Sequence, residues 1–176
     1  MENKTKEITK LIIALIILLS ILGGFILYVS FPLLSQTEVI LSTQPVDPFD
    51  PIRGQYMTIG YEINRIPEID NVKIGDTIYI ILEEDEEGIS RHKESLLTKP
   101  KEGIFIKGKV ESISGENMRV EYGIEQYFFE RGAKFETRIN NVKIKLSEFG
   151  GARIVKVLDE NKKPVKITYK NKTLTS

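Results

Sequence analysis

The chain has 176 residues, with 25 basic and 25 acidic residues and a formal net charge of zero. This length allows one domain beside an N-terminal segment, and the charge balance provides no basic footprint for nucleic acid. The sequence contains no cysteine, which excludes disulfides, thiolate metal sites and a cysteine nucleophile. Composition therefore predicts no nucleic-acid partner and points to no cofactor.

An uncharged apolar segment, "LIIALIILLSILGGFILYV", occupies residues 11 to 29. At about 1.5 Å per residue, a helix of this length measures roughly 28 Å, close to the ~30 Å hydrocarbon core of a bilayer. A secretory signal peptide has a shorter apolar core and ends at small residues, and "LYVSFPLLS" offers only a poor cleavage site. We expect an uncleaved transmembrane helix at residues 11–31, with a cleaved signal peptide as the alternative.

The charges around this segment predict its orientation. Lys4, Lys6 and Lys10 precede it, and no lysine or arginine follows until Arg53. Because positive residues mark the cytoplasmic side, we expect a single-pass protein of the cell membrane. Its predicted parts are a cytoplasmic N-terminus (1–10), the transmembrane helix (11–31), a juxtamembrane segment with a first strand (32–43) and an extracytoplasmic β domain (44–176).

The rest of the chain alternates apolar and polar residues in short runs. In "QYMTIGYEI", Met57, Ile59, Tyr61 and Ile63 fall on one face of an extended chain. A period of two is typical of strands with one buried face. This segment is therefore predicted to be a strand, with one of Tyr56 and Tyr61 in the core and the other on the surface. The alternative is a bulge at Gly60 that brings both rings to one side.

Turn residues between these runs predict antiparallel hairpins, at Gly115-Glu116 and at Gly150-Gly151. Only "GAKFETRIN", residues 132–140, has helical character outside the membrane, and we expect one short helix there. Many short strands with close turns are typical of small barrels and sandwiches. The predicted fold is mainly β with one short helix, a small antiparallel barrel or sandwich preceded by an N-terminal transmembrane helix.

The stretch "PVDPFDPIRG" spaces its prolines by three, and Asp47, Asp50 and Arg53 are spaced likewise. In polyproline II, with three residues per turn, these side chains line one edge about 9 Å apart. One interpretation is that the aspartates accept backbone hydrogen bonds in turns and Arg53 forms an ion pair. The other is a polar-ligand site or a docking surface. A shared metal ion is disfavoured, because carboxylates so far apart cannot bind one ion unless the chain bends.

A second polar and aromatic stretch is "GIEQYFFE". Tyr127 and Phe129 are expected to pack inward while Glu125 caps or pairs. The alternative is that Glu125 forms an acid/base pair with Asp47 or Asp50, as in glycoside hydrolysis.

The letters "GQYMTIGY" are similar to the motif that names the bacterial GDYXXLXY family. Gly54, Tyr56 and Tyr61 match it, whereas Gln55 stands in place of aspartate and Ile59 in place of leucine. Since an amide cannot ionise, either this position is structural or this member is inactive.

Further along, "YGIEQYFFERGAKFE" (Tyr122 to Glu136) is similar to a later segment of the same family, and the closing hairpin with "VLDENKKPV" resembles the family's end. The resemblance covers most of the predicted outer domain. It implies a membrane-anchored protein with no established activity, beside multi-pass membrane proteins.

Two functional hypotheses follow. The first is a non-enzymatic, single-pass accessory or interaction protein that works with a multi-pass membrane protein, and the second is a carboxylate-based cell-surface hydrolase. No metal site is expected, and the pattern names no small-molecule ligand. The candidate docking residues are Asp47, Asp50, Arg53, Tyr56, Tyr61, Glu125 and Tyr127.

Overall fold

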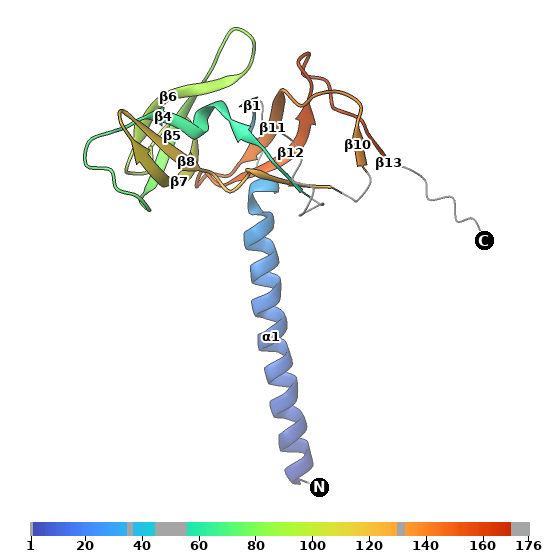
Figure 1. Ribbon diagram of the computed structural model, residues 1–176. Helices are drawn as coiled ribbons and strands as arrows, with labels where there is room; N and C mark the ends of the chain where they lie inside the picture. The colour runs from blue at the N-terminus through green and yellow to red at the C-terminus, as the bar shows by residue number, and fades with distance from the viewer. Residues whose placement is uncertain (1, 35–36, 45–55, 130–132, 170–176) are drawn as a thin grey trace, which may run out of the picture.

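The computed structural model describes residues 2–34, 37–44, 56–129 and 133–169, which form one long helix and a β domain (Figure 1). Helix α1 runs from Glu2 to Leu34 and projects away from the β domain (Figure 1). Within the described part of the chain, Ile8–Tyr28 is the one helical segment of sufficient length and hydropathy to cross a membrane. Its large apolar side chains are exposed, which fits a single-pass anchor surrounded by lipid.

Beyond α1, the described chain is mainly antiparallel β structure, which confirms the predicted fold class. The elements are β1 (Thr37–Gln44), β2 (Tyr56–Thr58), β3 (Gly60–Tyr61), the 3₁₀ turn η1 (Glu62–Asn64), β4 (Arg65–Pro67), β5 (Thr77–Glu84), β6 (Ser90–Leu96), β7 (Ile104–Ser114), β8 (Asn117–Glu121), β9 (Gln126–Phe128), β10 (Ala133–Phe135), β11 (Asn141–Leu146), β12 (Ala152–Leu158) and β13 (Ile167–Tyr169).

A five-stranded sheet has the order β4-β8-β7-β5-β6. Register shifts after Ile81 in β5 and after Val110 in β7 bend these strands, since a bulge increases local twist. The curvature brings β6 close to η1, where Arg91 forms ion pairs with Glu62 and, at 2.9 Å, with Asp85. The sheet therefore closes almost into a small barrel.

A four-stranded sheet has the order β12-β11-β1-β3. Its central strand β1 follows α1 directly and pairs with β11, from Thr37 opposite Leu146 to Ser42 opposite Asn141. The strand nearest the helix is thus held by the C-terminal part of the chain. Both predicted hairpins, β7–β8 around Gly115 and β11–β12 around Gly150, are confirmed.

Side chains from both sheets form one hydrophobic core. The predicted alternation is confirmed, because Met57, Ile59, Tyr61 and Ile63 are all buried. The segment is nevertheless split, since β2 pairs with β9 whereas β3 pairs with β1. The largest fully buried side chains are Tyr61, Leu41, Ile78, Ile80, Ile106, Met118, Ile144, Val110, Val120 and Val142.

The prediction of a short helix at residues 132–140 is wrong. Ala133–Phe135 form strand β10, which pairs with β13, and residues 136–140 are not helical. The ring of Phe135 packs edge-on against Phe129, with the ring centroids 5.3 Å apart. Pairing with a strand about thirty residues later and this aromatic contact override a weak local preference for helix.

Candidate functional site

Two buried tyrosines connect the segment around β3 with the connection between β8 and β9. The Tyr61 hydroxyl donates to the carbonyl oxygen of Ile124 at 2.7 Å, and the Tyr122 hydroxyl donates to that of Ile63 at 2.6 Å. Burial, aided by the charge of Glu125, raises the pKa of both hydroxyls well above the ordinary value of 10. Both therefore stay protonated at neutral pH and act as structural donors.

Glu125 and Asn64 extend this network. Oε1 of Glu125 accepts hydrogen bonds from the backbone N–H of Tyr122 at 2.7 Å and from Nδ2 of Asn64 at 3.1 Å. Asn64 Nδ2 also donates to the carbonyl oxygen of Val120 at 2.7 Å, and Asn64 Oδ1 accepts from the backbone N–H of Tyr61. Glu125 thus caps the connection between β8 and β9, as one of the two interpretations of its sequence predicted.

The second carboxylate oxygen of Glu125 has a different environment. Oε2 is buried and has no hydrogen-bond partner within the described part of the chain. Most buried polar atoms have a partner, and a buried carboxylate oxygen without one is an unsatisfied strong acceptor. Glu125 lies in the wall between two cavities, of about 450 Å³ and about 620 Å³, and Glu121 and Gln126 also line both.

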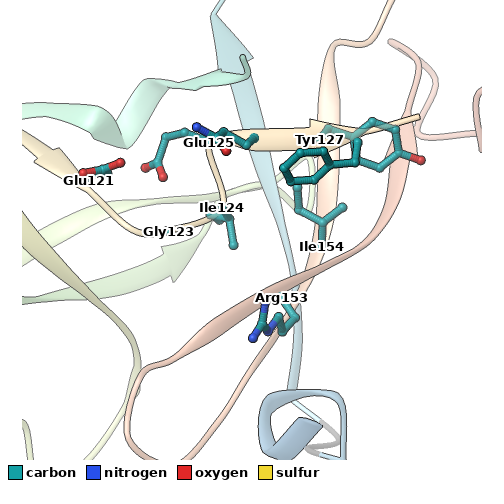
Figure 2. A pocket seen from close by; sticks show the side chains of 9 residues that line it. Glu121, Gly123, Ile124, Glu125, Tyr127, Arg153 and Ile154 are labelled. Carbon is teal, nitrogen blue, oxygen red and sulfur yellow. The ribbon is translucent and has the colours of Figure 1, made fainter. Parts of the chain in front are cut away.

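The smaller of these cavities is called here the β9–β12 cavity. Glu121 and residues 123–128 form one side of it, and Arg153 and Ile154 of β12 form the other (Figure 2). In Figure 2 the two carboxylates, Glu121 and Glu125, lie on one wall and the Arg153 guanidinium on the opposite side. The lining of the cavity therefore contains carboxylate acceptors on one side and a guanidinium group on the other.

Aromatic side chains complete this cavity. Tyr127 is half-buried and packs against the core together with Phe129, whereas Phe128 is 69% exposed. Neighbouring residues in a strand point to opposite faces, so the inward packing of residues 127 and 129 and the outward position of Phe128 follow from one geometry. The exposed ring gives the cavity an apolar edge.

The structure places the predicted site residues in different positions, and three of them lie outside the described residues. Asp47, Asp50 and Arg53 lie outside the described residues, and Tyr56 is described only through the backbone of β2, opposite Phe128. Glu125 and Tyr127 line the β9–β12 cavity. Tyr61 is fully buried, so it supports the residues that line the cavity and does not itself contact a ligand. Throughout residues 2–34, 37–44, 56–129 and 133–169, no three His, Asp or Glu side chains are grouped to hold a metal ion.

Sequence reasoning missed Asn64, Glu121 and Arg153. Nothing in the local pattern connects Arg153 with Glu125, because only the folding of the sheets brings β12 beside β9. The exposure of Phe128 could have been predicted, since a strand that contains "YFF" cannot bury all three rings on one face. Asn64 gave no comparable signal, because its role depends on its hydrogen bonds to Glu125 and to the carbonyl oxygen of Val120, both far along the chain.

Comparison with known proteins gives one match. Residues 18–157 match the family model described as GDYXXLXY protein, which extends from the second half of the apolar segment of α1 almost to the end of β12. No similar chain was found among curated proteins, and none was found among solved structures. The matched region contains Tyr61, Ile124 and Glu125, and therefore the whole hydrogen-bonded network described above. Because the match covers most of the sequence, the chain belongs to the GDYXXLXY family.

Proposed function

We propose that this protein is a single-pass, membrane-anchored accessory protein without catalytic activity, whose extracytoplasmic β domain docks a segment of a multi-pass membrane protein in the β9–β12 cavity. The observation that carries the proposal is Oε2 of Glu125, a buried acceptor without a partner among the described residues. A donor from a partner would complete its hydrogen bonding. Phe128, which is 69% exposed and lines the same cavity, adds the apolar surface that interface centres require.

The membrane part of the proposal is supported by α1. Ile8–Tyr28 have the length and hydropathy of a membrane span, and three lysines precede the apolar segment. The positive-inside rule favours a cytoplasmic N-terminus on these grounds. The β domain then lies on the same side of the membrane as the extracytoplasmic loops of a multi-pass partner.

The cavity also indicates the chemistry of the partner. A volume of about 450 Å³ accommodates a few side chains of a protruding loop. A backbone N–H or an amine of the partner suits the carboxylate of Glu125, which lines this cavity (Figure 2). With 25 basic and 25 acidic residues in the chain, the partner is selected by local contacts rather than by long-range attraction.

Photocrosslinking in native membranes tests this proposal. A photoreactive amino acid at Phe128 is expected to capture one multi-pass membrane protein, whereas the same amino acid at Ile74, which is 66% exposed and does not line the cavity, is expected not to. Glu125→Gln keeps the oxygen that binds Tyr122 and Asn64 but replaces Oε2 with a donor. We expect it to lower the Phe128 adduct about tenfold, since an unpaired buried polar group costs about 1–3 kcal/mol.

Two results would contradict docking. One is the same set of adducts from Phe128 and Ile74, and the other is an adduct yield that Glu125→Gln leaves unchanged. Thermal unfolding of the variant provides the control, because an unchanged midpoint shows that any loss of adduct arises at the cavity and not from misfolding.

A carboxylate-based cell-surface hydrolase is the second candidate. Glu121 and Glu125 line the same cavity (Figure 2), and paired carboxylates carry out glycoside hydrolysis. Aryl glycosides incubated with the purified full chain test this reading. Turnover that both Glu121→Gln and Glu125→Gln abolish would favour the hydrolase, and absence of turnover together with a specific Phe128 adduct would favour docking.

A further inference from the structure

The turn between β11 and β12, residues 147–151, lies at the end of the β domain that α1 joins. Thr37, the first residue of β1, pairs with Leu146, the last residue of β11, and β1 begins shortly after α1 ends at Leu34. Because the two strands are antiparallel, the turn that follows Leu146 extends past the start of β1 toward the helix. α1 contacts both β11 and β12, and Figure 1 shows this hairpin beside the top of the helix.

The length of the helix places this turn near the bilayer surface. The candidate span ends at Tyr28, and α1 continues to Leu34, which adds about 9 Å at 1.5 Å per residue. The headgroup layer on each side of a bilayer is roughly 5–8 Å thick. The helix therefore leaves the headgroup layer close to where the β domain begins, at the level of residues 147–151.

The turn holds an aromatic ring in a fixed position. Phe149 is 58% exposed, and Nζ of Lys99 lies 4.6 Å from its ring centroid. Backbone bonds fix the turn, from Gly150 N–H to the Ser147 carbonyl at 2.9 Å and from Lys107 N–H to the Gly150 carbonyl at 2.8 Å. Gly150 has φ of +78°, and a Cβ there would lie 2.9 Å from the Lys107 nitrogen. The turn is thus rigid and exposes Phe149 at its tip.

We propose that Phe149 and Lys99 form a second membrane contact, in which the ring enters the headgroup layer of the bilayer that holds α1 and the ammonium group binds a lipid phosphate. Aromatic rings and lysines are favoured at this depth, where one part is apolar and the other is solvated. Exposed Glu102 and Glu148 offset much of the charge of Lys99 and Lys101. The contact therefore depends on the ring and one phosphate, not on a broad basic patch.

This contact gives the β domain an orientation as well as an attachment. A single helix leaves the domain free to rotate about the helix axis and to tilt. A second contact at Phe149 restricts both motions and fixes the direction in which the β9–β12 cavity faces along the membrane. The inference rests on the membrane anchor of the proposed function, but not on docking in the cavity.

Tryptophan quenching by brominated lipids tests the contact. The chain contains no tryptophan, so Phe149→Trp supplies a single reporter in the full chain, reconstituted in nanodiscs of phosphatidylcholine and phosphatidylglycerol brominated near the headgroup. Glu160→Trp is the matched control, because it lies in the turn after β12, at the opposite end of the same hairpin. We expect F149W to lose most of its emission, E160W to retain it, and Lys99→Glu to restore emission to F149W.

Equal quenching of the two reporters, or no quenching of F149W, would overturn the contact. If F149W fails to fold by circular dichroism, Glu148→Trp gives a second reporter at an exposed position of the same turn. The anchor is tested separately, because a wild-type chain that does not enter nanodiscs overturns the anchor and the contact together. A blue shift of F149W emission without bromine quenching would show burial against protein and would also overturn it.

Discussion

The hydroxyl of Tyr61 and the carbonyl oxygen of Ile124, 63 positions apart in the sequence, are joined by a hydrogen bond of 2.7 Å. Tyr61 is the last residue of the stretch that resembles the family motif, and Ile124 belongs to the later "GIEQYF" stretch. The return bond from Tyr122 to Ile63 makes the connection reciprocal. The two stretches therefore form one structural unit, and its outer face is the wall of the β9–β12 cavity.

Removal of either hydroxyl is expected to destabilise the β domain. Tyr61→Phe and Tyr122→Phe each leave a buried carbonyl oxygen without its donor, which costs about 0.5–1.5 kcal/mol of unfolding free energy. Tyr79→Phe is the matched control, because Tyr79 is half-buried and its edge-on packing with Phe105 needs only the ring. Urea unfolding in detergent measures the difference, and equal losses in all three variants would contradict the structural role of the two bonds.

Stability is expected to fall at alkaline pH. The pKa values of Tyr61 and Tyr122 are raised in the folded protein, so the unfolded chain releases their protons first, near pH 10. The stabilisation is complete below that pH and is lost as pH rises, by roughly 1.4 kcal/mol per pH unit for each tyrosine. Unfolding followed between pH 9 and 11 should show this slope, and a Y61F/Y122F double variant with the same slope would contradict the assignment.

Glu125 is expected to tolerate an amide but not truncation. Glu125→Ala leaves the Tyr122 N–H and Asn64 Nδ2 without their shared acceptor, a loss of about 1–3 kcal/mol. Glu125→Gln preserves that acceptor and is expected to change the unfolding free energy little. Glu121→Ala is the control, since Glu121 is exposed. Equal losses from the alanine and glutamine variants would show that charge, not the accepted hydrogen bonds, stabilises the site.

Two glycines are expected to resist substitution for different reasons. A Cβ at Gly108 would lie 2.4 Å from Cγ1 of Val120 and 2.8 Å from the ring of Tyr122, so Gly108→Ala should cost about 1–3 kcal/mol through overpacking. Gly115 has φ of +62° and open space around it, so its alanine variant costs about 1–2 kcal/mol through backbone strain alone. In the same unfolding assay, Gly108→Ala should cost less stability in a chain that already carries Val120→Ala than in the wild-type chain. Gly115→Ala should cost the same in both.

The orientation of the chain is expected to place its C-terminus outside. A C-terminal alkaline phosphatase fusion should be active, because that enzyme folds only outside the cytoplasm, and a green fluorescent protein fusion at the same position should be dark. The membrane fraction should contain the chain at its full mass. A shorter, released product would show that α1 is a cleaved signal sequence, and an inactive phosphatase would reverse the topology.

The strands were predictable from the sequence where one local pattern determined them. The alternation of Met57, Ile59, Tyr61 and Ile63 identified the buried face, and the glycine turns identified the hairpins, since glycine accepts positive φ. The segment at residues 132–140 failed because its structure depends on β13, which lies far along the chain. The helix preference of a short segment depends only on neighbouring residues, so it cannot reveal a pairing with a strand so far along the chain.

The residues of the candidate site also form two groups, those that the sequence predicted and those that it did not. Glu125 and Tyr127 were identified because they lie within one recognisable stretch. Arg153 reaches the same cavity only through the packing of β12 beside β9, and Asn64 matters because its amide bonds to Glu125 and Val120. Such relations are set by tertiary packing, and no spacing in the sequence encodes them.

The position of β1 has a consequence for the biogenesis of the protein. The ion pair between Glu38 and Lys143 joins residues 105 positions apart, so the strand synthesised first after the anchor is completed by one of the last. Closing so long a loop is slow compared with forming local hairpins. The edge of β1 that pairs with β11, residues 37–42, therefore stays unpaired until β11 has been synthesised, whereas Thr43 and Gln44 pair with the earlier strand β3. For a chaperone that binds the growing chain, residues 37–42 would be the exposed strand edge that persists longest.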